Sequence, residues 1–233
     1  VSVIPRIFIG YDHRQPLAYN VLQHSIVAHA SRPVAITPLI LEQLPITRRG
    51  LTDFTYSRFL VPFLCDFKGS ALFLDADMVV TADILELFEH ASPAAGAVQV
   101  VKDQPQFEWP SAMLFNCSMC RVLTPDYIED QSNRLLDLAW AGEGGVGEFP
   151  AVWNALQFYG DEPPGKLLHF TAGLPCWPEM AHGPNVETWH EAAAAMTHTV
   201  SWRELMGGSV HAGPVIRRHL RETYGMDVSR APA

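Results

Sequence analysis

Two aspartates, Asp75 and Asp77, lie in the middle of an otherwise apolar segment, residues 72–80 (LFLDADMVV). An ionised carboxylate that is buried without a partner is costly, so such groups normally lie beside a cation, a metal ion or strong hydrogen-bond donors. In an extended chain, residues two positions apart project to the same side, so both carboxylates can bind one hard cation such as Mn²⁺ or Mg²⁺. In the alternative interpretation, one aspartate is exposed and the other caps a helix that begins near Ala82, although Asp83 is closer to that helix.

The elements expected around this pair alternate between apolar strands and amphipathic helices, which is typical of a mostly parallel sheet covered on both faces. In such an α/β fold the ligand crevice lies at the carboxyl ends of the strands, where both aspartates lie if residues 70–74 form a parallel strand. Apolar runs predict strands at residues 4–9, 34–41, 70–74, 96–101 and 112–116, and helical spacing predicts helices from residue 16 onward, at 56–65 with Thr55 as N-cap, and at 82–90.

The C-terminal half is less regular, with helices predicted at residues 188–197 and 212–224. The basic face of the second helix, formed by Arg217, Arg218 and Arg221, is interpreted as a solvated surface rather than a binding patch. No internal repeat and no long linker divides the sequence.

The composition limits the class of protein. The net charge of -9 comes without any cluster of Lys and Arg, so nucleic acid is not an expected partner. No run of eighteen or more apolar residues and no secretory signal occur, so we expect no transmembrane segment. The expected location is the cytoplasm, or the periphery of a membrane if the protein acts on a lipid-linked molecule. A hydrophobic content of 48% supplies one substantial core, which predicts a single domain over residues 1–233.

The four cysteines, Cys65, Cys117, Cys120 and Cys176, are too few for a disulfide framework in a chain of this length. Cys117 and Cys120 have C-x-x-C spacing, but no second Cys/His pair follows at zinc-site spacing. We therefore interpret these two as small residues packed near a core strand.

Two stretches, residues 8–26 (FIGYDHRQPLAYNVLQHSI) and 57–80 (SRFLVPFLCDFKGSALFLDADMVV), resemble conserved segments of glycosyltransferase family 8. This family includes glycogenin and the bacterial lipooligosaccharide galactosyltransferases. The resemblance implies a GT-A fold and a Mn²⁺-dependent, retaining transfer of a sugar from a UDP-sugar. It also implies that residues 1–101 form the nucleotide and metal half and residues 102–233 the acceptor side. The metal would be held by both aspartates and a distant histidine.

The family's metal site is closed by an H-F-x-G-x-x-K-P-W segment, which residues 169–177 (HFTAGLPCW) resemble. The His-Phe start and the Trp keep their offset, so His169 carries over as the third metal ligand. The Gly is displaced by one position and the Lys is absent, so another group must supply the cationic contact to the diphosphate.

The resemblance also implies a set of donor contacts. Gly10, Tyr11 and Asp12 would form the loop that contacts base and ribose, because a strand ending in Gly lets the backbone approach a ligand closely. Arg58 matches an arginine that contacts the donor, and Asp103 stands at about the place of an acidic residue that touches the donor sugar. The implied set is completed by Tyr56, Ser111, Gly173 and Trp177.

The family's D-Q-D-x-x-N motif is matched only by its last residue, Asn154, so the group expected below the anomeric carbon is missing. Glu148 is a candidate substitute and equally a plain loop carboxylate, which leaves Glu148 and Asn154 as the catalytic candidates. The expected function is transfer of a sugar from a nucleotide-sugar to a glycan, lipid-linked or protein acceptor. One alternative is a non-catalytic nucleotide-sugar binder on the same fold. Another is a metal-dependent phosphohydrolase or nucleotidyltransferase, although no G-x-x-x-x-G-K-[ST] loop occurs.

Overall fold

A computed structural model describes residues 4–103, 107–158 and 165–197, together with residues 213, 217, 218, 221 and 222. The chain divides into two compact units, residues 1–196 and 197–233, and the expectation of one domain stays a prediction. Most of the helix predicted at 212–224 lies outside the described residues. Within it, Arg218 and Arg221 are exposed, and Arg218 pairs with Glu222 at 2.9 Å, as expected of a solvated face.

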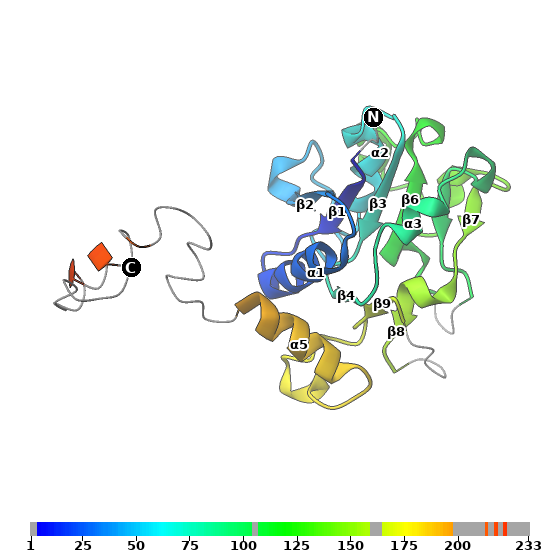
Figure 1. The fold of residues 1–233 in the computed structure, drawn as a ribbon. Helices are drawn as coiled ribbons and strands as arrows, with labels where there is room; N and C mark the ends of the chain where they lie inside the picture. Colours follow the sequence, from blue (N-terminus) through cyan, green and yellow to red (C-terminus); the bar gives the residue numbers. More distant parts are fainter. Residues whose placement is uncertain are drawn as a thin grey trace. The chain divides into compact units, whose positions relative to one another are not determined.

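The first unit is built on a mixed six-stranded sheet in the order β2-β1-β3-β6-β5-β7 (Figure 1). β1 pairs in parallel with β2 and β3, and β5 with β7, whereas β6 is antiparallel to β3 and β5. The predicted α/β fold with a mixed, mostly parallel sheet is therefore confirmed. The strands are β1 (Arg6–Gly10), β2 (Ala35–Leu39), β3 (Ser70–Leu74), β5 (Val98–Val100), β6 (Ala112–Asn116) and β7 (Val146–Glu148).

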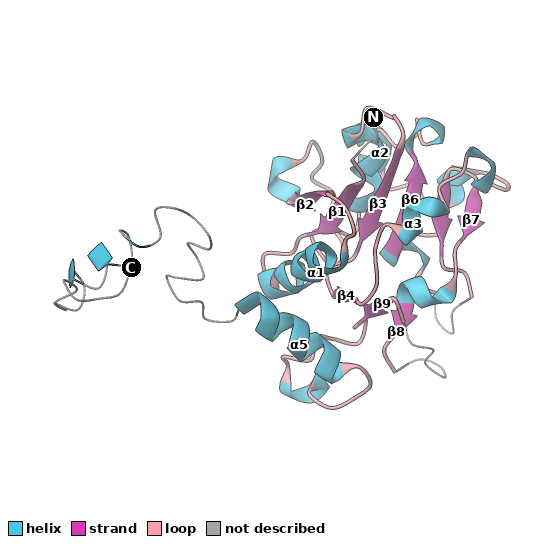
Figure 2. Ribbon diagram, in the orientation of Figure 1, coloured by secondary structure: helices cyan, strands magenta, loops and turns pink. Residues whose placement is uncertain are grey.

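Helices and short 3-10 turns connect these strands (Figure 2). Helix α1 packs against β1 and against β4 (Met78–Val80), and its Val21, Leu22 and Ile26 are buried. The helices are α1 (Pro16–His29), α2 (Val61–Leu64), α3 (Glu86–Glu89), α4 (Pro125–Glu129) and α5 (Val186–Thr197). The 3-10 turns are η1 (Leu41–Gln43), η2 (Ser57–Leu60), η3 (Pro93–Ala95), η4 (Trp109–Ser111), η5 (Cys117–Met119), η6 (Ala139–Ala141), η7 (Ala151–Asn154) and η8 (Pro178–Met180). No helix in the described ranges is long and apolar enough to cross a membrane.

The helix predicted at residues 56–65 is wrong as a single element, because the segment forms η2 and then α2. Pro62 has no N–H to donate to a preceding carbonyl, so it fits the first turn of a new helix and not the interior of an old one. Thr55 is not an N-cap, since its Oγ1 accepts from the backbone N–H of Thr52 at 3.0 Å. The consequence is that Arg58 is held in a tight 3-10 turn.

A second, three-stranded sheet was not predicted, and its order is β4-β9-β8. It consists of β4 (Met78–Val80), β8 (Ala155–Leu156) and β9 (Leu167–His169). β4 is antiparallel to β9, with Met78 opposite His169, and Phe170 N–H donates to the carbonyl of Asp77 at 2.8 Å. This small sheet therefore places His169 beside the segment that carries Asp77.

Three of the four cysteines lie in the core. Cys65, Cys117 and Cys120 are buried, Cys176 is exposed, and all four are free thiols. The Cys120 thiol donates to the carbonyls of Ala97 and Asn116, both at 3.2 Å. The interpretation of Cys117 and Cys120 as packed residues is confirmed.

Candidate metal centre

Asp75, Asp77 and His169, called the metal centre below, converge from three strand ends. Asp75 follows β3, Asp77 precedes β4 and His169 ends β9. One potential ligand atom from each lies within 4.8 Å of the other two. Because Mg²⁺ sits about 2.0–2.1 Å from its ligands, opposite ligands of one ion lie about 4 Å apart, and the limit of 4.8 Å is close to that spacing. The alternative helix-capping interpretation is wrong, since the Asp83 carboxylate accepts from Leu85 N–H at 3.1 Å.

The carboxylates of the metal centre are only partly paired. The Oδ1 atoms of Asp75 and Asp77 are buried and have no hydrogen-bond donor among the described residues. Arg58 Nη1 forms an ion pair with Asp75 Oδ1 at 3.0 Å, but its hydrogen bond goes to the carbonyl of Pro110 at 2.7 Å. Burial raises the pKa of Asp75 to about 7, and the neighbouring charge of Asp77 adds to this, although Arg58 opposes it. A divalent cation bound between Asp75 and Asp77 would stabilise the ionised forms of both carboxylates.

His169 is buried and held from both ring nitrogens. Its Nδ1 lies 2.9 Å from Asn154 Oδ1, and its Nε2 lies 3.4 Å from Asp77 Oδ1. Burial alone would lower the pKa of His169, but the carboxylates of Asp77 and Asp75 outweigh burial and raise it. The Nε2 atom therefore faces the carboxylates and is the ring atom available to a metal.

The metal centre opens into a cavity of about 390 Å³, within the size range of ligand sites. Five predicted residues line it: Arg58, Asp75, Asp77, Ser111 and His169. The remaining lining residues are Leu51, Thr52, Phe54, Thr55, Phe107, Glu108, Pro110, Leu136 and Thr171. The floor is thus charged, whereas Leu51, Phe107 and Leu136 expose 88%, 53% and 38% of their surface to solvent.

Glu108 is a cavity residue that the sequence did not single out. Its carboxylate accepts hydrogen bonds from Ser111 Oγ at 2.9 Å and from Thr171 Oγ1 at 3.1 Å. It also contributes to the raised pKa values of Asp75 and His169. A weak signal was present in the sequence, because Glu108 stands between two aromatic residues just before an apolar strand.

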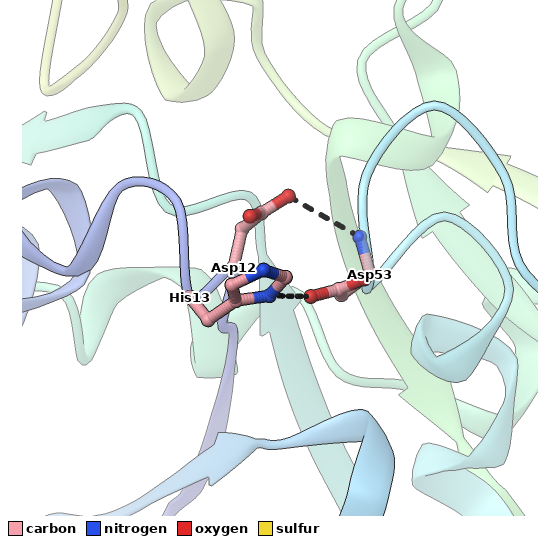
Figure 3. A group of neighbouring side chains, drawn as sticks. All are labelled: Asp12, His13 and Asp53. Atoms are coloured by element: carbon pink, nitrogen blue, oxygen red, sulfur yellow. Dashed lines mark hydrogen bonds and ion pairs between the residues drawn. The ribbon is translucent and has the colours of Figure 1, made fainter.

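Asp12, His13 and Asp53, called the loop cluster below, tie the loop after β1 to the segment before η2 (Figure 3). Asp53 N–H donates to Asp12 Oδ2 at 3.3 Å, and His13 Nδ1 lies 2.6 Å from Asp53 Oδ2. Hydrogen bonds from Arg14 lower the pKa of Asp12 to about 2. Asp12 is thus bonded to Asp53, whose neighbours Thr52 and Phe54 line the cavity, and is not itself among the lining residues.

Gly10 and Tyr11 are also not among the lining residues of the cavity. A Cβ atom on Gly10 would overlap the ring of Phe54, which lines the cavity. The ring of Tyr11 packs edge-on against Tyr19, with 5.7 Å between centroids. The close approach predicted for Gly10 is therefore made by a side chain of this protein.

Other predicted residues are absent from the lining of the cavity in the part of the chain that the structure describes. Asp103 and Glu148 are exposed, and Trp177 exposes 47% of its surface. Asn154 is buried behind His169. The Arg48 guanidinium covers the Tyr56 ring, 3.9 Å from its centroid, and Gly173 has a positive φ of 133°.

Comparisons with known proteins identify one relative by sequence and several by structure. No protein-family model matches the chain. Protein CDI from Arabidopsis thaliana is 34% identical over 207 residues, which cover 73% of this chain and 78% of that protein.

Three solved glycosyltransferases are similar in structure. The apo structure of the bifunctional glycosyltransferase WbbM has a TM-score of 0.63 at 16% identity over 83% of this chain. The glycosyltransferase GlyE of Streptococcus pneumoniae TIGR4 has a TM-score of 0.61 at 15% identity over 82% of this chain. The chain covers 50% of the WbbM chain and 60% of the GlyE chain. The galactosyltransferase LgtC, solved with donor and acceptor sugar analogs, has a TM-score of 0.56 at 14% identity, over 85% of this chain and 99% of LgtC. At these identities the likeness shows the fold, which is GT-A.

Proposed function

We propose that this chain, which belongs to the same family as Protein CDI of Arabidopsis thaliana, is a metal-dependent glycosyltransferase. It would move a sugar from a nucleotide-diphosphate sugar, with UDP-sugars the first candidates, to a hydroxyl of a glycan, lipid-linked or protein acceptor. The observation that carries the proposal is the convergence of Asp75, Asp77 and His169 on the floor of the cavity of a GT-A fold. The UDP donor and retention of configuration follow the resemblance to family 8.

The residues present fit a bound Mn²⁺ or Mg²⁺ ion. Asp75 and Asp77 offer oxygen ligands whose buried Oδ1 atoms accept no hydrogen bond from any described residue, and His169 offers Nε2. One imidazole with two carboxylates suits Mn²⁺ better than Mg²⁺, which prefers oxygen ligands alone. An ion bound there would supply Lewis-acid stabilisation of the leaving nucleoside diphosphate.

Arg58 is the positive group that supports donor binding in this proposal. It is the only Lys or Arg in the described lining of the cavity, and it stands in for the Lys that residues 169–177 lack. Its guanidinium is fixed by Nε donating to the carbonyl of Phe54 at 3.3 Å and by Nη1 donating to Pro110. A guanidinium held in this way can contact a phosphate or sugar oxygen without a further loss of side-chain entropy.

Glu108 is the group proposed to bind hydroxyls of the donor sugar, in place of the exposed Asp103. Two hydroxyl donors, on Ser111 and Thr171, already fix its carboxylate at the cavity. A carboxylate has about four lone-pair sites, so it can accept further hydrogen bonds from a ligand. The same fixed orientation would discriminate between sugars that present a hydroxyl there and sugars that do not.

The test is binding and turnover with a panel of nucleotide-sugars, with and without Mn²⁺. We expect metal-dependent thermal stabilisation by one of them, since a ligand at 100 times its Kd adds about 2.7 kcal/mol. Release of the nucleoside diphosphate should accompany it. Asp77→Asn should abolish the metal-dependent part of the thermal stabilisation. Asp103→Asn, which removes an exposed carboxylate, is the matched control. Stabilisation that survives Asp77→Asn unchanged would rule out the proposed site.

A second candidate function, a non-catalytic nucleotide-sugar binder, is favoured by one observation. The two residues considered for the chemistry at the anomeric carbon lie away from the cavity lining, since Glu148 is exposed and Asn154 is buried behind His169. The same panel separates the two candidates. Metal-dependent binding without hydrolysis or transfer to any acceptor tested would favour the binder.

A further inference from the structure

We propose that Asn154 is a positioning residue that fixes the tautomer of His169 and directs Nε2 of that ring at the metal centre. The inference rests on the proposed function for the metal that His169 would bind. It assigns Asn154 a task distinct from the catalytic role considered for it from sequence, because the side chain touches a ligand of the metal and not the cavity.

The contact between the two side chains defines the tautomer. Asn154 Oδ1 and His169 Nδ1 are 2.9 Å apart, and each residue is only 2% exposed. An amide oxygen has no hydrogen to give, so Nδ1 must carry the proton of this bond. A neutral imidazole has one N–H, which leaves Nε2 with the lone pair that a metal ion requires.

The orientation of the Asn154 amide is itself fixed by a second bond. Its Nδ2 donates to the backbone carbonyl of Glu108 at 3.2 Å. A carbonyl can only accept, so rotating the amide by 180° would set two oxygen acceptors against each other. The same rotation would turn Nδ2 toward His169 and reverse the tautomer. The carbonyl of Glu108 therefore favours this orientation of the Asn154 amide, and the amide oxygen favours the Nδ1–H tautomer of His169.

The pairing of β8 with β9 places Asn154 and His169 next to each other. Asn154 ends η7 directly before β8, and β8 pairs in parallel with β9, whose last residue is His169. The N–H of Gln157 donates to the carbonyl of His169 at 2.9 Å, so residues 154 and 169 belong to one hydrogen-bonded unit. A site on paired strands is positioned more exactly than a site on loops.

Loss of the Asn154 contact would act on metal affinity without removing a ligand. With the other tautomer, an N–H would point at the carboxylates of Asp75 and Asp77, and the ring would have to exchange its proton before it bound metal. Loss of an outer partner of a metal-binding histidine typically lowers metal affinity about 10–100-fold. We expect a loss of this size for Asn154→Ala.

The first experiment is calorimetric titration with MnCl₂ of the parent chain and of three variants. Asn154→Ala should lose about 10–100-fold in affinity, whereas Asn154→Asp should recover part of it, since a carboxylate also accepts from Nδ1–H but cannot donate to the carbonyl of Glu108. Gln157→Ala is the matched control, because the side chain of Gln157 is equally buried and lies three residues from Asn154. The side-chain amide of Gln157 donates to the carbonyl of Pro184 and does not contact the His169 ring, and its backbone bond to His169 remains in the variant. An equal loss in the Asn154→Ala and Gln157→Ala variants would overturn the proposal.

The second experiment reads the tautomer directly, by ¹⁵N-imidazole NMR of the metal-free protein at alkaline pH. The His169 signals are assigned by their absence in His169→Gln. The parent chain should show the Nδ1–H tautomer, and Asn154→Ala should shift it toward Nε2–H. An Nε2–H tautomer in the parent chain would overturn the proposal even if the Ala variant fails to fold. If the parent chain binds no Mn²⁺, the proposed function fails, and the tautomer alone then decides the role of Asn154.

Discussion

The metal centre and the loop cluster contain the same side chains, two aspartates and one histidine, but they neutralise their charge differently. In the loop cluster, Arg14 pairs with Asp12 at 2.5 Å, and the pKa of Asp12 falls to about 2. In the metal centre, burial raises the pKa of Asp75 to about 7 even though Arg58 lies 3.0 Å away. The comparison teaches that the same residue types can stand in opposite electrostatic settings. We therefore predict that the less fully paired carboxylates, Asp75 and Asp77, bind the metal rather than those of the loop cluster.

The largest expected difference between the metal centre and the loop cluster is in Mn²⁺ affinity after one aspartate of each group is replaced by asparagine. Asp75→Asn removes a ligand of the metal centre, so Mn²⁺ affinity should fall by more than the about 10–100-fold expected for loss of an outer partner. Asp12→Asn removes a carboxylate that is already paired with Arg14 and should leave Mn²⁺ affinity nearly unchanged. Calorimetric titration of both variants with MnCl₂ measures the difference. The reverse pattern would mean that the loop cluster binds the metal.

The stability of the metal-free protein should depend on pH because of the metal centre, and we expect this effect to be smaller than the change in Mn²⁺ affinity. The folded-state pKa of Asp75, about 7, lies above the ordinary value of 3.8, so its contribution to stability is complete below pH 3.8 and is lost as pH rises through 7. The raised pKa of His169 acts in the same direction, since its contribution is complete below 6.5 and is lost above the folded-state pKa. The free energy of unfolding without metal should therefore fall between about pH 5 and about pH 8.

Urea unfolding in the presence of a chelator measures this slope, and repeating it with Mn²⁺ should remove most of it, because the bound cation stabilises the ionised carboxylates. Asp75→Asn serves as the control, since the variant should show a flatter pH dependence than the parent chain. A metal-free stability that rises over this range, or an identical slope in the variant, would contradict the assignment of the metal centre.

The part of the fold that sequence could predict is the part with long apolar strands. Residues 70–74 and 112–116 are apolar except for Ser70 and Asn116 at their ends, and both strands have the predicted bounds. The sheet of β4, β8 and β9 could not be predicted, because strands of two or three residues are too short for a recognisable period. The pairing of β4 with β9 also joins residues about ninety positions apart, which no local pattern encodes.

The candidate site divides in the same way between local and long-range information. Asp75 and Asp77 are recognisable because their carboxylates interrupt an apolar run. His169 required the family resemblance, since its place beside Asp77 depends on the pairing of β4 with β9. Glu108 was missed because its partner Thr171 lies 63 residues away, and nothing local shows that the carboxylate lies at the cavity.

The smallest expected effect is the contribution of the loop cluster to stability at acidic pH. The folded-state pKa of Asp12, about 2, lies below the ordinary value of 3.8, so its contribution to stability is present above pH 3.8 and is lost as pH falls through 2. Asp12→Asn should therefore be slightly less stable than the parent chain at neutral pH, and the two stabilities should converge between about pH 4 and about pH 2. Because Arg14 is largely exposed, solvent screens its pair with Asp12 and keeps the difference small. Chemical unfolding of both proteins over this range measures it. A difference that persists undiminished to pH 2 would mean that Asp12 stabilises the loop through packing and not through its charge.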